Sequence, residues 1–286
     1  MRKDEKIFFL IGDTGYNLVE PLFEEFPDRT LNVGIAEQNL IGIAAGLCNM
    51  GFKPVCYAIS QFLTQRCYEQ VRNDLCFHDY PVTLVGTATG LDHGANWASH
   101  YILDDIGCLK PLPNIHIYSP SSVESIKKVF NETMNLPHPS YIRITKSVFS
   151  ENKEIDGINR FILENENSDT LVISHGRMIK NSLEASKILP EFSIFAMDKI
   201  KPIDDSTTKI LENYKNIVVI EDNFNSGLYN TMCQFIAEKR IGGKFVYSIS
   251  VNEDFGGTTG STKFLDERFG LTVEQIVNFI EKLLNK

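Results

Sequence analysis

Short apolar runs alternate with longer amphipathic runs along nearly the whole of this 286-residue chain. The apolar runs have the length of β-strands, and the segments between them have the apolar spacing of helices. Parallel neighbouring strands need a crossover connection, which a helix usually supplies. The alternation therefore predicts an α/β fold with two mainly parallel sheets, each covered by helices on both faces. The predicted strands cover residues 7–11, 54–59, 81–86, 111–118, 140–146, 170–174, 192–197, 217–221 and 245–250. The predicted helices cover residues 19–26, 37–50, 60–75, 123–135, 178–189, 206–213, 226–240 and 272–284.

The length of the chain predicts two domains of ordinary size. A polar stretch interrupts the alternation just after the middle of the chain and is expected to be a linker. We therefore expect a first domain over residues 1–147, a linker over 148–158 and a second domain over 159–286. The glycine-rich run 256–261 lacks the lysine and the spacing of a nucleotide-binding P-loop, so we expect a surface or interface loop there.

Composition narrows the function classes. The chain is 43% hydrophobic and 23% charged, with a net charge of −9, which is typical of a soluble globular protein. An acidic balance argues against a dedicated nucleic-acid binder, and no apolar run is long enough to span a membrane. The run 7–11 is too short for the core of a signal peptide. The six cysteines are scattered without a C-x-x-C pair, so we expect free thiols and a cytoplasmic location.

A glutamate stands in the first turn of the helix predicted over residues 37–50. The segment 41–47 is almost entirely small or apolar, so we expect this helix to be buried on most of its surface. A carboxylate in such a place is costly to desolvate without a partner. Glu37 is therefore either a solvated first-turn residue that the helix dipole favours, or a group that awaits a polar ligand. The residues alone leave both interpretations open.

The phrase NVGIAEQN-x-IGIAAGL, residues 32–47, resembles the pyrimidine-binding domain of transketolases and 1-deoxyxylulose-5-phosphate synthases. The resemblance implies thiamine diphosphate as cofactor. It also implies that Glu37 hydrogen-bonds N1′ of the aminopyrimidine, which favours the 4′-imino tautomer that removes the proton from thiazolium C2. The fold implied is a pyrimidine-binding domain followed by a transketolase C-terminal-like domain.

The segment 60–73 resembles the family pattern F-x-x-F-x-x-R-A-x-x-Q-I-R. Its second aromatic stacks on the aminopyrimidine, and Phe62 matches it; an apolar ring can bind a heteroaromatic face in this way. The first aromatic of the pattern falls on Ile59, which is expected to enclose the cofactor less fully. The alternative for Phe62 is a plain core phenylalanine.

Another family motif is missing. Gly12 and Asp13, with Asn39 further on, are faintly similar to the GDG…N motif that holds magnesium and diphosphate in thiamine enzymes. We reject the match because the third glycine is absent and Asn39 belongs to the pyrimidine-domain phrase. Asp13 is kept as a candidate cofactor contact, and no metal ligands are predicted in this chain.

A long polar loop, 87–100, follows the predicted strand 81–86 at its carboxyl end, where open α/β sheets place ligands. Ser99 and His100, followed by Asp104 and Asp105, resemble the transketolase run G-x-(S/T)-H-Q-x-x-E-D. His100 thus matches a histidine that lines the substrate channel, where it can bind hydroxyls or move protons.

The same loop departs from the family. Asn96 stands where the family has a substrate-contacting aspartate, Ala88 where it has a histidine that helps bind sugar phosphate, and Trp97 where it has a glycine. Asparagine can still hydrogen-bond a hydroxyl, but without charge. The substrate pocket is therefore expected to differ although the cofactor half is retained. His93 has no assigned counterpart, and a structural role is expected for it.

The family also carries an arginine for the substrate phosphate near the end of the last strand of this domain. Lys146 lies near that position, and Arg143 is the competing candidate one turn away. Lysine binds phosphate as a point charge, without the bidentate fork of arginine. A solvated strand end is the alternative for each.

The resemblance covers the whole chain, but it is to the C-terminal half of a transketolase. The domain that would bind diphosphate and Mg²⁺ or Ca²⁺ has no counterpart here. We therefore expect the smaller subunit of a split transketolase, active with a separately encoded partner, as an α₂β₂ assembly. The predicted reaction is transfer of a two-carbon ketol unit from a ketose to an aldehyde or ketone sugar, with a nucleotide-linked acceptor as one candidate. The alternatives are an ordinary pentose-phosphate transketolase subunit, a 2-oxo acid dehydrogenase-type β subunit and a non-catalytic scaffold.

Overall fold

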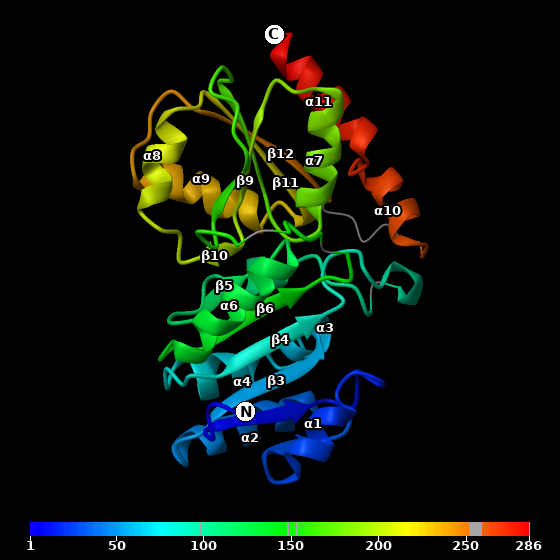
Figure 1. The fold of residues 1–286 in the computed structure, drawn as a ribbon, viewed down its shortest axis with the longest axis vertical. Coiled ribbons are helices and arrows are strands. Elements are labelled where there is room, and N and C mark those ends of the chain that lie inside the picture. Colours follow the sequence, from blue (N-terminus) through cyan, green and yellow to red (C-terminus); the bar gives the residue numbers. More distant parts are fainter. Residues whose placement is uncertain (98, 148, 153, 252–258, 286) are drawn as a thin grey trace.

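The computed structural model describes residues 1–97, 99–147, 149–152, 154–251 and 259–285, and they form two stacked α/β units (Figure 1). The seven-stranded sheet of the first unit has the order β10-β5-β6-β4-β3-β1-β2, and every pairing among β1 to β6 is parallel. The strands are β1 (Ile7–Ile11), β2 (Thr30–Asn32), β3 (Lys53–Ile59), β4 (Thr83–Thr87), β5 (His116–Tyr118), β6 (Ser140–Ile144) and β10 (Lys199–Lys201).

The second unit contains a five-stranded sheet of order β12-β11-β8-β9-β7, parallel except for the edge pairing of β7 with β9. The predicted fold class, mainly parallel α/β in two parts, is confirmed. The strands are β7 (Arg160–Leu163), β8 (Thr170–Ser174), β9 (Ser193–Ala196), β11 (Asn216–Phe224) and β12 (Phe245–Val251).

One strand crosses between the two units. Strand β10 lies in the predicted second domain, yet it pairs antiparallel with β5 at the edge of the first sheet. The described linker residues are also tied down: Arg160 pairs with Glu151, which accepts from the Ser122 hydroxyl, and Lys128 Nζ donates to the Ile155 carbonyl. The exact domain boundaries stay a prediction.

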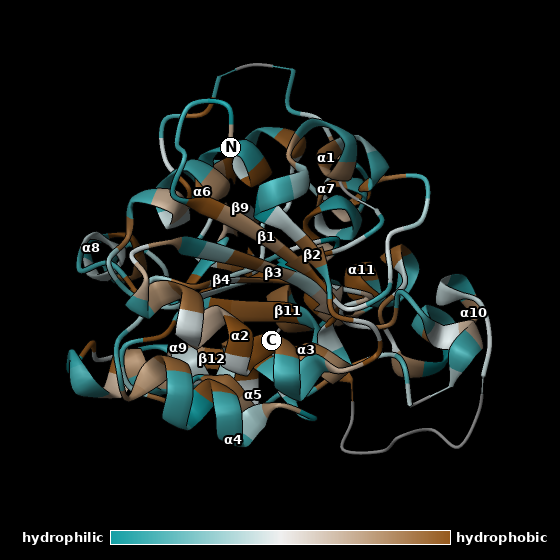
Figure 2. Ribbon diagram, turned by 90° about the horizontal axis from the view of Figure 1, so that it is seen from below, coloured by the Kyte–Doolittle hydropathy of each residue, from teal (hydrophilic) through white to brown (hydrophobic). Residues whose placement is uncertain are grey.

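Helices cover both sheets, with polar faces outward and apolar strands inside (Figure 2). They are α1 (Glu20–Glu25), α2 (Glu37–Asn49), α3 (Ser60–Thr64), α4 (Tyr68–Gln70), α5 (Asp105–Leu109), α6 (Val123–Asn135), α7 (Met178–Ile188), α8 (Ser206–Glu212), α9 (Leu228–Glu238), α10 (Thr262–Phe269) and α11 (Val273–Leu284), with a 3₁₀ turn η1 (Pro27–Arg29), a π-helical turn η2 (Val71–Cys76) and a 3₁₀ turn η3 (Gly94–Asn96). In the described part of the chain no helix has the length and apolarity needed to cross a membrane.

Two helix predictions need correction. Helix α2 ends as expected, with Gly51 at a φ of +87°, but its buried residues are only Glu37, Leu40, Ile41 and Ala44. One face packs on the sheet, and the small residues of the other face are left open in this chain. The helix predicted over 60–75 is interrupted after Thr64. Cys67 leaves helical geometry, with φ −106° and ψ 15°, and its thiol donates to the Phe62 carbonyl.

The core is continuous across the two units. Leu84, Ile106 and Ile117 of the first unit share one cluster of buried apolar side chains with Ile173 and Met197 of the second. The units are therefore packed against each other rather than joined only by a tether. The loop predicted at 256–261 falls partly on residues 256–258, which lie outside the described residues; Ser261 accepts a hydrogen bond from Phe264 N and caps α10.

Candidate functional site

Glu37 is a buried and paired carboxylate of the first unit. Its side chain is 3% exposed, at the start of α2, and its Oε2 accepts a hydrogen bond of 2.7 Å from Nη1 of Arg66. It lies beside the end of β1, where a Cβ on Gly12 would come within 3.5 Å of its Cγ. Of the two interpretations left open for Glu37, the solvated first-turn residue disagrees with the structure, because the carboxylate is buried and paired.

Phe62 lies next to this pair. The guanidinium carbon of Arg66 is 3.8 Å from the centroid of the Phe62 ring, so the guanidinium stacks on the ring while it donates to Glu37. Helix α3 carries Phe62, and Ile59, half-buried, directly precedes that helix. Gln38 donates to the Arg66 carbonyl at 3.1 Å, which ties the start of α2 to the segment after α3.

His100 reaches the same place from the loop after β4. Its ring makes an edge contact with Phe62, with centroids 5.4 Å apart. Nδ1 of His100 lies 2.9 Å from the Ser99 hydroxyl, and the tautomer decides which of the two donates. Three side chains predicted from separate segments, Glu37, Phe62 and His100, therefore form one cluster with Arg66.

Asp13 lies at the carboxyl end of β1 but is engaged with the neighbouring loop. Its backbone N–H donates to Oδ1 of Asn32 at 3.2 Å, and Nδ2 of Asn32 donates to Oδ1 of Asp13 at 3.0 Å. Asp13 has a φ of +49°, a left-handed conformation that aspartate tolerates. These contacts hold the turn that leads into α2; a cofactor contact by Asp13 stays a prediction.

The departures in the His100 loop have distinct surroundings. Asn96 is exposed at the end of η3. Trp97 is 55% exposed with a φ of +70°, a conformation suited to the glycine that the family has here. Ala88 also has a positive φ, +61°, but is buried. His93 is half-buried, and burial together with the positive charge of Lys146 lowers its pKa.

The two phosphate-binding candidates are separated by the structure. The side chain of Lys146 is exposed, and its backbone N–H donates to Asp92 at 2.6 Å. Arg143 lies in different surroundings, and a substrate-phosphate role for it stays a prediction. Its guanidinium is fully buried, paired with Asp105 at 2.7 Å and donating to Oδ1 of Asn223 at 2.6 Å. A strand residue points to one face only, and at this position that face meets the second unit.

Sequence reasoning missed the carboxyl end of β11. Glu221, Asp222 and Asn223 are all buried, and they follow directly on a run of apolar strand residues. Although burial acts to raise it, the guanidinium groups of Arg177 and Arg143 hold the pKa of Asp222 below its usual value. Three polar residues in succession at the end of a buried strand were the available signal.

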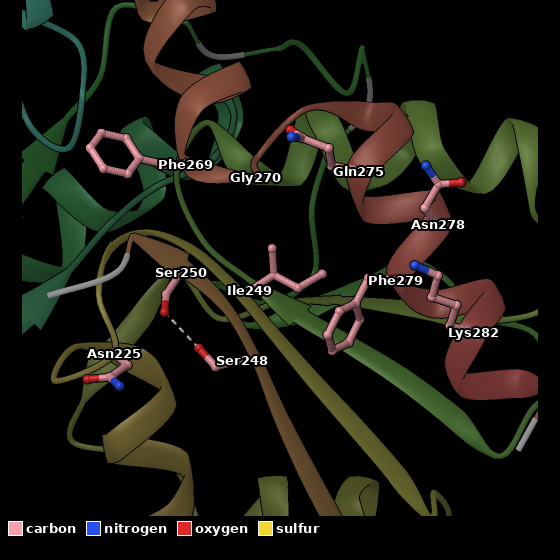
Figure 3. A pocket seen from close by; sticks show the side chains of 10 residues that line it. All are labelled: Asn225, Ser248, Ile249, Ser250, Phe269, Gly270, Gln275, Asn278, Phe279 and Lys282. Carbon is pink, nitrogen blue, oxygen red and sulfur yellow. Dashed lines mark hydrogen bonds between the residues drawn. The ribbon is translucent and has the colours of Figure 1, made fainter. Parts of the chain in front are cut away.

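A separate cavity of about 580 Å³ opens on the second unit (Figure 3). Asn225, Ser250 and Lys282 are among its lining residues, and the Ser248 hydroxyl donates to Ser250 Oγ at 2.9 Å. None of the predicted site residues is among the lining residues. The candidate site is thus the cluster at Glu37 and not this cavity.

The residues at Glu37 fit a planar, hydrogen-bonding ring. The guanidinium of Arg66 is flat and carries N–H donors, and it lies where it can both stack on Phe62 and donate to Glu37. An aminopyrimidine offers the same two features, a flat face and, in its imino tautomer, a ring N–H. Glu37 and Phe62 therefore fit such a ring and would hold it.

Two family models match the chain. The one described as transketolase, pyrimidine binding domain, matches residues 1–150, and the one described as transketolase, C-terminal domain, matches residues 160–276.

Individual proteins agree with these models. A subunit of the apulose-4-phosphate transketolase of Actinobacillus succinogenes is 29% identical over 229 residues, covering 77% of this chain and 74% of its own. A 6-deoxy-6-sulfo-D-fructose transketolase subunit of Clostridium sp. (strain MSTE9) is 27% identical over 293 residues, covering 96% and 88%. A solved structure described as a split gene transketolase, inactive beta4 tetramer, superposes with a TM-score of 0.85 at 27% identity, covering 99% of this chain and 93% of its own.

Proposed function

We propose, from the premise that this chain belongs to the transketolase family, that it is the pyrimidine-binding subunit of a split enzyme that depends on thiamine diphosphate. The observation that carries the proposal is the cluster of Glu37, Phe62 and His100, with a planar cation between the first two. When bound, thiamine diphosphate supplies the electron sink for cleaving the bond next to a ketose carbonyl.

The residues of this chain then have separate tasks. The buried Glu37 carboxylate accepts a hydrogen bond from the pyrimidine ring and sets the protonation of that ring. Phe62 packs against the ring face. His100, beside Phe62, binds substrate hydroxyls or moves a proton. Ile59 and Asp13 are proposed as outer contacts of the cofactor, and Asn96 as a substrate contact.

A separately encoded subunit would complete the site. We propose that Glu37 and Phe62 contact the pyrimidine end of thiamine diphosphate, and that a partner with the diphosphate-binding domain holds the metal ion, Mg²⁺ or Ca²⁺, in an α₂β₂ assembly. The two relatives named as transketolase subunits and the solved split gene transketolase support a split arrangement. The cysteines of this chain are all free thiols, and on that ground we propose a reducing, cytoplasmic location.

The transferred unit is proposed to be a two-carbon ketol group. The two relatives are named for a sugar phosphate and a sulfo-sugar, and the exposed Lys146 offers a cation for such an anionic end. A nucleotide-linked acceptor is the alternative that Ala88 and Asn96 motivate. The gathering of Glu37, Phe62 and His100 in one place argues against a scaffold without activity.

Reconstitution tests the proposal. The chain is mixed with the candidate partner subunit, thiamine diphosphate binding is measured by calorimetry, and ketol transfer from xylulose 5-phosphate is followed with phosphorylated and nucleotide-linked acceptors. Glu37→Gln keeps the side-chain shape and removes the charge, so turnover is expected to fall about 100-fold or more. Full turnover by this chain without a partner, or an unchanged rate for Glu37→Gln, would refute the proposal.

A further inference from the structure

The loop that carries His100 begins and ends against the second unit. The described residues of this loop, 88–97 and 99–104, leave β4 and return to α5. Its two ends are held together by short bridges of Thr89 and Gly90 with Ile102. The side chains of Leu91 and Leu103 pack in the core cluster of the second unit, not of the first. Figure 1 shows the loop reaching across to the start of α10.

The carboxyl end of β11 contacts both ends of the loop. At the start, Asp222 lies directly against Gly90, where a Cβ would fall 1.9 Å from Oδ2 of Asp222. At the end, the Phe224 N–H donates to the Leu103 carbonyl at 2.8 Å. Immediately beyond, Nδ2 of Asn223 donates to Oδ1 of Asp105 at 2.8 Å.

The middle of the loop rests on α10. A Cβ on Gly94 would come within 2.2 Å of a methyl carbon of Leu265, and the Gly260 N–H donates to the Gly94 carbonyl at 3.3 Å. The Thr262 hydroxyl donates to the Leu91 carbonyl at 3.5 Å. Close backbone approach at Gly90 and Gly94 leaves little room for the loop to shift against the second unit.

Arg177 links the carboxyl end of β11 with α10. Its Nε donates to Oδ2 of Asp222 at 2.6 Å, and its Nη1 and Nη2 donate to the two carboxylate oxygens of Asp266 on α10 at 3.0 and 2.7 Å. All three side chains are buried or nearly so. A charge-assisted, bidentate link of this kind fixes orientation as well as distance.

We propose that Asp222 and Asn223 are positioning residues, through which the second unit holds His100 against Phe62. The expected effect on turnover rests on the proposed function, whereas the expected effect on the motion of the loop concerns this chain alone. The second unit then affects how His100 meets the substrate. It does not contact Glu37 or Phe62 through this loop, because these two residues belong to α2 and α3.

The chain contains its own reporter. Its one tryptophan, Trp97, lies in the loop three residues before His100 and is 55% exposed. We compare the wild type with Asp222→Asn, which keeps the side-chain volume and weakens the link to Arg177. The matched control is Glu221→Gln, the neighbouring buried carboxylate, which accepts from the N–H groups of Leu228 and Tyr229 at the start of α9 and not from the loop.

Acrylamide quenching and anisotropy of Trp97 are measured in the free chain. Asp222→Asn is expected to raise the quenching constant about twofold and to lower the anisotropy, since the loop opens more often; Glu221→Gln is expected to change neither. Equal quenching in Asp222→Asn and the wild type overturns the proposal. If Asp222→Asn does not fold, Asn223→Ala tests the same proposal, because it removes the donor to Oδ1 of Asp105 and is likewise expected to raise the quenching constant. Unchanged quenching in a folded Asn223→Ala chain also overturns the proposal.

The assembled enzyme gives the second readout. Asp222→Asn is expected to lower kcat/KM for the ketose about 10-fold while the Kd for thiamine diphosphate stays unchanged; a loss of both together would indicate a merely structural role and overturn the positioning role. Absence of turnover in the wild-type assembly would count against the proposed function. The Trp97 measurement would still show whether Asp222 holds the loop in place.

Discussion

The guanidinium of Arg66 lies between Glu37 and Phe62, donating to the carboxylate at 2.7 Å and stacking on the ring at 3.8 Å. The ion pair offsets the cost of burying the Glu37 carboxylate, which is 3% exposed in the first turn of α2. A ligand that stacks on the same face of Phe62 and hydrogen-bonds Glu37 would displace the guanidinium. Arg66 is 42% exposed, so it has room to swing outward.

Removal of Arg66 is expected to destabilise the free chain. Arg66→Ala takes the donor away from a buried carboxylate, which typically costs about 1–3 kcal/mol, and the exposure of Arg66 places the expected loss near the lower end. Urea unfolding measures it. Arg72→Ala is the matched control, because Arg72 is exposed and donates to its neighbour Asn73. A double variant with Glu37→Gln should recover part of the loss, and an Arg66→Ala chain as stable as the control would contradict the pairing.

A second prediction concerns the anionic end of the substrate. Lys146→Ala is expected to raise KM for a phosphorylated ketose about 10-fold in the assembled enzyme, because a positive charge near the phosphate is lost. The KM for an unphosphorylated ketose should hardly change. Lys209→Ala, an exposed lysine on α8, serves as the control. An equal effect on both kinds of ketose would remove Lys146 from the substrate site.

A third prediction follows from the thiols. Burial raises the pKa of Cys48 and Cys67 to about 12, that of Cys76 to about 11, and that of Cys56 well above its usual value. The folded state thus keeps these groups neutral, while the unfolded chain ionises them near pH 9. Their contribution to stability is present below that pH and is lost as the pH rises towards 12.

Two measurements check the thiol prediction. The urea midpoint should fall between about pH 8 and pH 10, and iodoacetamide should label these four cysteines slowly at about pH 8 in the folded chain, because the thiolate is the reactive form. The control is labelling of the same four cysteines in the chain unfolded by about 6 M urea. Rapid labelling of Cys56 in the folded state would contradict its burial.

The sequence predicts the strands of the two sheets better than it predicts the tertiary contacts of their edges and covering helices. Apolar runs such as 171–173 and 217–220 identify buried strands, because strands covered on both faces of a parallel sheet are nearly continuous apolar runs. Strand β10, Lys199–Lys201, has only one apolar residue and was missed; its pairing with β5 is a tertiary contact. The composition of α2 predicts burial on most of its surface, but in this chain only one face of the helix is covered.

The candidate site shows the same division. The cluster of Glu37, Phe62 and His100 was anticipated from motif resemblance, although 38 residues separate the last two in sequence. The burial of Arg143 was not anticipated, since the sequence does not say that its face of β6 meets Asn223. Contacts between distant segments decide such roles, and local pattern carries no signal for them.

The last prediction concerns the backbone at Trp97. Its φ of +70° with ψ of 171° lies in a region that is essentially restricted to glycine and costs other residues about 1–3 kcal/mol. Trp97→Gly should therefore be more stable than Trp97→Ala by about 1 kcal/mol, the reverse of the order found at ordinary positions. Thermal unfolding of the two variants measures the difference. Asn96→Gly against Asn96→Ala is the control, because Asn96 is not among the residues with positive φ. If Trp97→Ala is as stable as Trp97→Gly or more stable, the backbone of the loop relaxes freely at this position. That outcome would also mean that the tryptophan is not held in place by the supports at Gly90 and Gly94.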